Sequence, residues 1–287
     1  MISAPTYQAG LPQPIVDRLV ASALEEDLGL AGDITTNATV LSTQPISASV
    51  AARSGGIISG HQLAAAAFRS LDPNLTITHL GHDGAHVEAG TALIELTGAP
   101  QAILSAERVA LNFMIHMSGI ATHTARYVEA IAGTNSAICC TRKTLPGLRA
   151  VEKYAVKCGG GMNHRFGLDD AVLIKDNHIA AAGGIENAIN AARTAVGHMT
   201  KIEIEVDTLV QLAEVLKHTT DVIMLDNMSN EDLRKAVTMV DGSAVTEASG
   251  GVNLDTVRGI AETGVDMISV GALTHSAPAL DLGLDFH

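Results

Sequence analysis

The sequence predicts an α/β protein whose larger part is an α/β barrel with fewer than eight units. From residue 136 onward, strand-like and helix-like segments alternate, which is typical of right-handed βαβ units around a parallel sheet. Polar residues stand at the ends of these strands, where α/β barrels form their active sites. One of the strands also alternates charged with apolar residues. These observations favour a barrel over an open doubly wound sheet.

The first third of the chain mixes helices and strands without regular alternation. A long helical pattern near its end is expected to break at Ser118-Gly119, and a hairpin-like pattern turns at Gly90. Apolar spacing predicts helices over 15–26, 62–71 and 102–132, and strands over 46–52, 75–80 and within 87–96.

The barrel segment contains six apolar runs of strand length, each separated from the next by a segment that could form a crossover. The expected strands are 137–140, 171–174, 202–206, 222–225, 244–246 and 267–270, and the expected helices are 148–157, 185–196, 209–217, 230–240 and 254–263.

Composition narrows the class of protein. The chain has 287 residues and a net charge of −13, and 47% of its residues are apolar, enough for a sizeable core. Aromatic residues make up only 2%, so stacking platforms for bases are scarce and nucleic-acid binding is not expected. Three cysteines without CxxC spacing, no secretory signal and no apolar run of membrane-spanning length predict a cytoplasmic protein that does not bind membranes.

Positive charge is concentrated in residues 141–178. This segment holds 7 of the 18 Lys and Arg residues but only 4 of the 31 acidic residues, so it carries +3 while the rest of the chain carries −16. An acidic protein with one such cationic segment is expected to build a pocket for a small, highly charged anion, because nucleic acid would require a broad basic face.

Within this segment, Arg142 and Lys143 directly follow a strand, which suits a carboxylate or a phosphate. As a pair alone they are a weak signal, since a solvated surface pair is about as common. His164 and Arg165 follow three consecutive glycines, and Arg165 is the better anion ligand of the two. Lys175 ends a strand and is either an anion ligand or a Schiff-base nucleophile.

One helix of this segment carries three cations at i, i+4 and i+8 spacing, namely Arg149, Lys153 and Lys157. We interpret Lys153 and Lys157 as part of a solvent-exposed face.

Carboxylates stand on the neighbouring strands. In residues 201–206, Glu203 and Glu205 alternate with apolar residues and are expected to point into the barrel, which is tolerable only if they are paired or metal-bound. Glu205 and Asp226 end consecutive strands and suit Mg²⁺ and sugar hydroxyls. Ion pairs to Lys175 or to the arginines explain them equally well without a ligand.

Small residues follow the last two strands. Ser249, Gly250 and Gly251 follow the first of them, Val270 ends the second, and Gly271 and Ala272 come next. In α/β barrels such turns bind phosphate through backbone N–H groups. Glu247 stands just before the first turn.

Taken in order, these segments resemble the quinolinate phosphoribosyltransferase family, also called carboxylating nicotinate-nucleotide pyrophosphorylases. The resemblance covers nearly the whole chain. Its most specific parts are EEDLGLAGDITT (25–36), ERVALNFMIHMSGIAT (107–122) and TRKTLPGLRAVEKYAVKCGGGMNHRFGLDD (141–170). Shorter segments that include LIKDNHI (173–179) and EASGG (247–251) complete it.

The resemblance implies a two-domain architecture. A smaller N-terminal α/β sandwich would span 1–119, with the tail 277–287 packed on it, and an incomplete, seven-stranded α/β barrel would span 120–276. It also implies at least a homodimer with shared active sites, in which Arg108 enters the neighbouring subunit's site.

The implied reaction is phosphoribosyl transfer from phosphoribosyl pyrophosphate to quinolinate with decarboxylation, a step of de novo NAD biosynthesis that uses Mg²⁺. Its catalytic residues would be Lys143, Lys175, Glu205 and Asp226, the last two close to the metal. The residues implied to bind the two substrates are Arg108, Thr141, Arg142, Lys143, His164, Arg165, Lys175, Glu205, Asp226, Ser249, Gly250, Gly251, Val270, Gly271 and Ala272.

Three alternatives remain open. A paralogous phosphoribosyltransferase would act on another pyridine or other acid, a Schiff-base lyase would use Lys175, and a non-catalytic protein would bind the anions without releasing pyrophosphate.

Overall fold

The computed structural model describes residues 10–42 and 44–287, and these fall into two compact units. One unit contains residues 126–145 and 161–275, and the other contains the described residues up to 125 together with 146–160 and 276–287. Residues 146–160 group with the N-terminal part of the chain, which is a difference from a division into two continuous segments.

The helix α5 (Arg149–Cys158) explains that difference. Its Glu152 carboxylate lies 2.9 Å from Nε2 of His116 on α4 (Pro100–Ala130), and Tyr154 donates a hydrogen bond of 2.9 Å to Asp83. A Cβ atom at Gly159 would lie 2.3 Å from the carbonyl oxygen of Ala121, so α5 ends in direct contact with α4.

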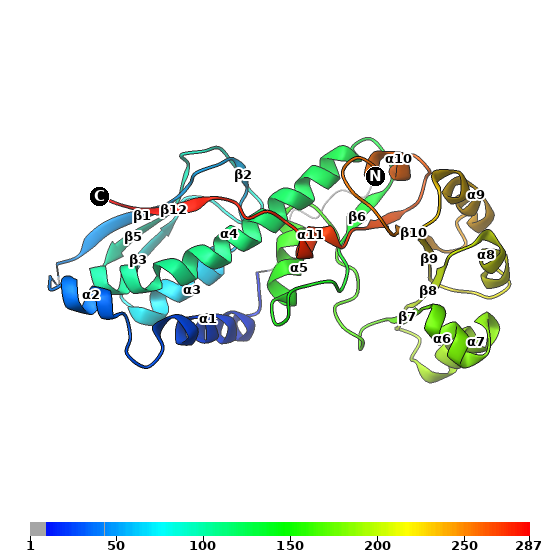
Figure 1. The fold of residues 1–287 in the computed structure, drawn as a ribbon, viewed down its shortest axis with the longest axis horizontal. Helices are drawn as coiled ribbons and strands as arrows, with labels where there is room; N and C mark the ends of the chain where they lie inside the picture. The colour runs from blue at the N-terminus through cyan, green and yellow to red at the C-terminus, as the bar shows by residue number, and fades with distance from the viewer. Residues whose placement is uncertain (1–9, 43) are drawn as a thin grey trace. The chain divides into compact units, whose positions relative to one another are not determined.

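The N-terminal unit is built on a four-stranded antiparallel sheet in the order β12-β1-β5-β3, with helices α1, α3 and α4 on one side of it (Figure 1). The last strand of the chain, β12, pairs with β1 from Ala48↔Phe286 to Ala52↔Leu282. Besides α4 and α5, the elements of this unit are α1 (Gln13–Leu28), α2 (Ile34–Thr39), β1 (Ile46–Ala52), β2 (Gly56–Ile57), α3 (His61–Leu71), β3 (Thr76–His79), β4 (His86–Val87), β5 (Ala92–Gly98) and β12 (Leu282–Phe286).

Two expectations for this unit are wrong. β4 and β5 do not form a hairpin, because β4 pairs with β2 while β5 pairs with β1 and β3, although the chain does turn at Gly90. The helix α4 is also not broken near Ser118-Gly119. Glycine at 119 makes room for a neighbouring chain segment, since a Cβ there would lie 2.2 Å from the carbonyl oxygen of Pro278.

The interpretation of Lys153 as solvent-exposed is also wrong, because Lys153 is completely buried. Lys157, on the same face, is exposed as expected. Helical spacing identifies a shared face but not what packs against it.

The other unit is an incomplete parallel barrel. Its six strands follow the order β6-β11-β10-β9-β8-β7, and helices α6 to α10 lie on their outer side (Figure 1). The elements are β6 (Ala137–Cys139), β7 (Val172–Ile174), α6 (Asp176–Ala182), α7 (Ile185–Ala195), β8 (Ile202–Val206), α8 (Leu209–Val215), β9 (Val222–Asp226), α9 (Asn230–Val240), β10 (Val245–Ser249), α10 (Val257–Ala261), β11 (Met267–Ser269) and α11 (Ala272–His275).

The family resemblance implies seven strands, whereas the sheet of this unit has six strands and one irregular position between β6 and β7. Met162 pairs with Cys139 of β6 through a single parallel bridge, and no ladder among the described residues joins this segment to β7. The chain turns here because Asp170 accepts hydrogen bonds from the backbone N–H groups of Phe166 and Gly167. The segment therefore forms a loop at the carboxyl ends of the strands.

Strand β8 shows the predicted alternation. Ile202, Ile204 and Val206 are buried at 5%, 0% and 1% exposure, while Glu203 and Glu205 point the other way, into the barrel. Helices start soon after the strands because polar caps satisfy their first N–H groups, as Thr208 does for α8. The strand ends, and the polar residues on them, thus lie at one face.

Candidate active site

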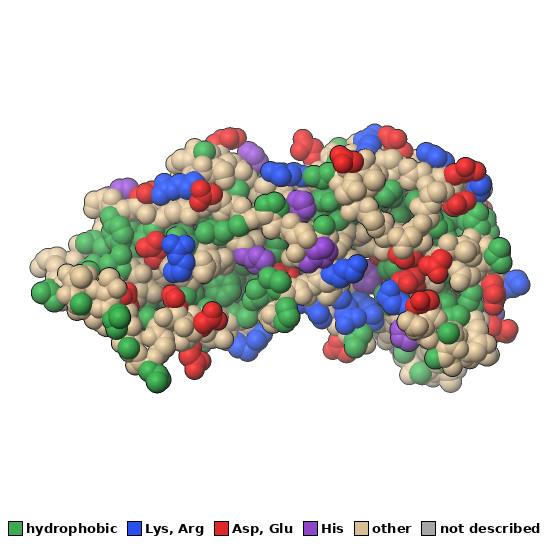
Figure 2. All heavy atoms as spheres, viewed as in Figure 1, with side chains coloured by type: hydrophobic (Ala, Val, Ile, Leu, Met, Phe, Trp, Pro, Cys, Tyr) green, Lys and Arg blue, Asp and Glu red, His purple; other side chains and the backbone are tan. Residues whose placement is uncertain are grey.

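A cavity of about 590 Å³ lies at the carboxyl ends of the barrel strands, within a single compact unit. Most of the predicted site residues line it: Thr141, Arg142, Lys143, His164, Arg165, Lys175, Glu205, Asp226, Ser249, Gly250 and Gly251. In the space-filling view, Lys and Arg side chains gather beside Asp and Glu side chains in the region of β8 and β9 (Figure 2). Residues far apart in the sequence are therefore brought together as expected.

Arg142 and Arg165 give the cavity its strongest positive character. Burial, together with the charge of Arg142, lowers the pKa of the Arg165 guanidinium. Nε of Arg142 is buried, and no described residue accepts a hydrogen bond from it. Two arginines that repel each other, one with an unused buried donor, are arranged to bind an anion, because a carboxylate between them relieves both costs.

Lys143 is positioned by the segment after β11. Its backbone carbonyl accepts a hydrogen bond of 2.7 Å from the Thr274 hydroxyl, and its backbone N–H donates one of 3.0 Å to Thr141. A Cβ at Gly271 would lie 3.0 Å from Cδ of Lys143, so glycine leaves room for that side chain.

The predicted residues after β11 do not line the cavity themselves. Val270 is buried at 1% exposure, and Gly271 and Ala272 are half-buried. Gly271 therefore does not form the cavity wall, but the absence of a side chain there leaves room for Lys143, which does line the cavity.

The acidic side of the cavity is formed by β8 and β9. Glu205 makes an ion pair with Nζ of Lys175. This is the alternative explanation from the sequence, in which the carboxylate is paired without any ligand. Carboxylate oxygens of Glu205, Asp207 and Asp226 lie within 4.8 Å of one another. Such a set of oxygen ligands fits a hard divalent cation, and Asp207 was not predicted to belong to it.

The turn after β10 is tightly packed against the end of β9. The Asn227 N–H donates a hydrogen bond of 2.9 Å to the carbonyl of Ser249. Gly250 has a φ of 92°, and a Cβ there would lie 2.1 Å from Oδ1 of Asn227. Gly251 has a φ of 61°, but a Cβ there would meet nothing within 4 Å. Only the first glycine is required by its neighbours.

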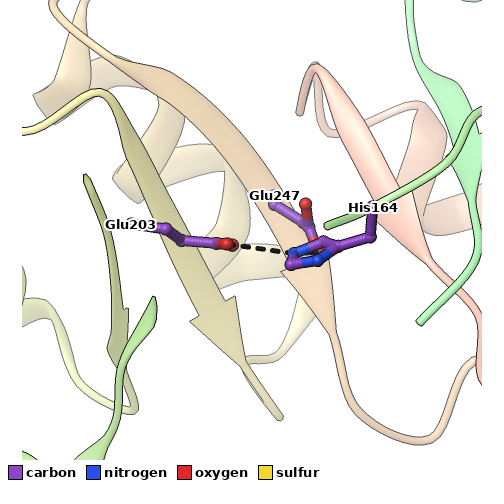
Figure 3. A group of neighbouring side chains, drawn as sticks. All are labelled: His164, Glu203 and Glu247. Atoms are coloured by element: carbon purple, nitrogen blue, oxygen red, sulfur yellow. Dashed lines mark ion pairs between the residues drawn. The ribbon is translucent and has the colours of Figure 1, made fainter. Parts of the chain in front are cut away.

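Three side chains meet in the barrel interior next to the cavity. Glu203 of β8 and Glu247 of β10 point toward the ring of His164 (Figure 3). Nε2 of His164 lies 2.9 Å from Glu203 and 3.6 Å from Glu247. Burial, and then the charge of Glu203, raise the pKa of Glu247 to about 7.

Sequence reasoning missed several residues of this site. Glu203 was predicted to point into the barrel and Glu247 to stand near the end of a strand, but neither was assigned to the site. The sequence did offer a signal for Asn227, because an Asp-Asn pair follows two of the expected strands. In the structure Asn227 has a φ of 53°. The other unpredicted lining residues are Leu173, Met224 and Ser269, which carry no sequence signal of their own.

Arg108 is the one predicted substrate ligand outside this compact unit. It is exposed on α4 and does not line the cavity.

Comparison with known proteins assigns the family. Residues 33–118 match the N-terminal domain of quinolinate phosphoribosyl transferase, and residues 120–285 match its C-terminal domain. The chain belongs to the quinolinate phosphoribosyl transferase family. The family predicted from the sequence motifs is thereby confirmed.

The relatives of the chain are similar over most of their length. A probable carboxylating nicotinate-nucleotide pyrophosphorylase of Bacillus subtilis is 44% identical, over 91% of this chain and 89% of the relative. The Mycobacterium leprae enzyme of that name is 44% identical, over 93% and 95%. A solved nicotinate-nucleotide pyrophosphorylase structure from Francisella tularensis superposes with a TM-score of 0.94 at 41% identity, covering 99% of this chain and all of that one. The predicted fold class is confirmed by this likeness.

Proposed function

We propose that this cavity is the active site at which the chain carries out the reaction of its family. The chain is a phosphoribosyltransferase that transfers the phosphoribosyl group of phosphoribosyl pyrophosphate to quinolinate. The products are nicotinate mononucleotide, pyrophosphate and CO₂, a step of NAD biosynthesis. The observation that carries this proposal is one cavity lined by Arg142, Lys143, Arg165 and Lys175 together with the carboxylates of Glu205 and Asp226. The Asp207 carboxylate lies within 4.8 Å of the last two.

The cationic residues of the cavity answer the main energetic difficulty of this reaction. Quinolinate carries two carboxylates and its partner several phosphate charges. Two like charges at ~5 Å repel by roughly 3 kcal/mol at an effective dielectric constant of ~20. Arg142 and Arg165 would clamp the dicarboxylate, with Lys143, His164 and Lys175 adding positive charge. The pyridine nitrogen can then approach the anomeric carbon.

The carboxylate groups at the cavity would serve the sugar and the metal. Glu205 and Asp226 would stabilise the positive charge that develops on the anomeric carbon as pyrophosphate leaves. Glu205, Asp207 and Asp226 would hold Mg²⁺ directly or through water. When bound, the ion would neutralise pyrophosphate charge.

The chemistry of the ring follows from the first step. Attack by the pyridine nitrogen leaves it quaternary and positively charged. The adjacent carboxylate can then leave as CO₂, because the positive nitrogen stabilises the electron pair that remains on the ring carbon. That electron pair then takes up a proton, which gives nicotinate mononucleotide. The enzyme's part in this step is to keep the ring oriented through the remaining carboxylate.

A second subunit would complete the site. Arg108 is exposed on α4 and is not among the residues that line the cavity, and we propose that it enters the site of a partner copy. Exposed apolar side chains on the loops that carry Lys143 and Arg165 support a covered cavity mouth; Leu145, Phe166 and Leu168 are 44%, 46% and 73% exposed.

The alternative of a Schiff-base lyase is disfavoured. Lys175 makes an ion pair with Glu205 and its side chain is 46% exposed. Schiff-base lysines are activated by desolvation or by a neighbouring cation, and an ion-paired ammonium is a poor nucleophile.

The activity is tested with purified protein, Mg²⁺, phosphoribosyl pyrophosphate and either quinolinate or nicotinate. We expect the mononucleotide and an equal amount of CO₂ from quinolinate, and no product from nicotinate. Mononucleotide from nicotinate would instead support the paralogous transferase, and binding without pyrophosphate release would support the non-catalytic alternative. Chelation of the metal with EDTA should abolish turnover, and added Mg²⁺ should restore it.

The cellular location stays a prediction. Among the residues described, no helix combines the length and apolar character needed to cross a membrane.

A further inference from the structure

The cluster of His164, Glu203 and Glu247 holds more acceptors than donors. A single ring nitrogen of His164 faces both carboxylates, at 2.9 Å and 3.6 Å, so its N–H can serve only the nearer Glu203. The two glutamates are buried at 6% and 3% exposure. In each, Oε1 is buried with no hydrogen-bond partner among the described residues.

Two buried carboxylates this close to each other favour a shared proton. The ligand atoms of the three side chains all lie within 4.8 Å of one another. Like charges at that distance in a buried site disfavour full ionisation, and a proton on one carboxyl group supplies the missing donor. Glu247 is the carboxylate farther from the imidazole, and its raised pKa of about 7 is consistent with that position.

The groups around Glu247 do not remove the preference for a proton on one of the two carboxyl groups. Its neighbours are Glu203 on β8, His164 on the loop after Met162, Cys139 on β6 and Ser269 on β11. Arg142 and Arg165 line the same cavity, and Arg165 interacts with Glu203. Cys139 and Ser269 bond to the ionised carboxylate and His164 favours it, but burial and the charge of Glu203 outweigh them.

We propose that Glu247, with His164 and Glu203, forms a proton-binding site that fills when a dicarboxylate enters the cavity. His164 and Glu247 both line that cavity, so an incoming dianion lies close to them. Two added negative charges make the ionised form of Glu247 less favourable, and the carboxyl group takes up a proton from solvent. Glu203 and Glu247 are thus positioning residues that adjust the charge facing the substrate. This inference rests on the proposed substrate site.

The test is proton-linked calorimetry with quinolinate and no phosphoribosyl pyrophosphate. Titrations in buffers of different ionisation enthalpy count the protons taken up on binding. With a free-protein pKa of about 7, Glu247 is half-protonated at pH 7, so uptake of about 0.5 proton per site is expected there. At pH 5.5 the group is already protonated and the uptake should approach zero.

A variant and a control separate this site from other groups. Glu247→Gln mimics the protonated carboxyl group, so it should bind quinolinate without proton uptake at pH 7. Glu186→Gln on α7, which is exposed, should retain the uptake. In steady-state assays, the wild-type KM for quinolinate should rise about tenfold between pH 7 and pH 8.5, and this rise should be absent in Glu247→Gln.

Two results would overturn the proposal. One is quinolinate binding to the wild-type protein at pH 7 without proton uptake, a measurement that does not depend on the folding of any variant. The other is unchanged uptake in Glu247→Gln. If quinolinate does not bind at all, the proposed substrate site fails and the inference with it, which is a distinguishable outcome.

Discussion

Replacing Arg142 by methionine should weaken catalysis without weakening the fold. Its guanidinium is half-buried, its Nε has no partner among the described residues, and its charge disfavours that of Arg165. A charge at about 4 Å from a carboxylate contributes about 4 kcal/mol at an effective dielectric constant of 20. We halve this for solvent exposure, which leaves about 2 kcal/mol, or a 30-fold loss of kcat/KM for quinolinate.

The fold should respond in the opposite direction. Removing Arg142 relieves its repulsion with Arg165, so the free energy of unfolding in urea should stay constant or rise by up to about 1 kcal/mol. The assay pairs steady-state kinetics with urea denaturation. Arg142→Lys keeps the charge but loses the planar fork and should fall in between, and Arg193→Met on exposed α7 controls for net charge. Unchanged kinetics, or a loss of stability that accounts for the lost activity, would refute the reasoning.

Three further predictions concern the turn, the assembly and the pH dependence. Gly250→Ala should lower kcat/KM for phosphoribosyl pyrophosphate at least tenfold, because its Cβ would clash with Asn227, whereas Gly251→Ala should cost threefold or less; equal effects would contradict the steric argument. Heterodimers of Arg108→Ala with Lys175→Ala subunits should recover part of the activity that each variant lacks, and confirmed heterodimers without recovery would speak against shared sites. Glu247 has a folded pKa of about 7 against an unfolded value of 4.5, so its contribution to stability is complete below pH 4.5 and is lost as pH rises through 7. Urea denaturation should show a loss of roughly 3 kcal/mol between pH 4.5 and pH 8 that is absent in Glu247→Gln; the same loss in both proteins would exclude Glu247 as its source.

The barrel could be predicted from the sequence because the pattern of each strand appears within a few neighbouring residues. Alternation in residues 202–206 placed Glu203 and Glu205 inside, and the strand-end positions of Arg142 and Asp226 predicted one functional face. These inferences need only the period of a strand and the rule that parallel strands end at the same edge.

The rest depended on contacts between distant segments. Lys153 follows the spacing of an exposed face but is buried. Gly119 does not end α4, and the reason for a glycine at this position is the close approach of Pro278, which is distant in the sequence. The meeting of His164 with Glu247 likewise depends on where the loop after Met162 lies relative to β10. No local pattern predicts which segments of the chain pack against each other. The family resemblance predicted the substrate-binding and catalytic residues, but not the contacts between these segments.

A crystal structure of the protein with quinolinate tests the central claim most directly. The claim is that cations at the carboxyl ends of the barrel strands hold the dicarboxylate. The N-terminal unit offers a natural comparison, since it has a second cavity of about 530 Å³ lined by His61, Arg69 and His79 among others. We predict quinolinate in the barrel cavity, with its carboxylates within hydrogen-bond distance of Arg142 and Arg165. Quinolinate bound in the N-terminal cavity, or in the barrel without contact to either arginine, would contradict the account.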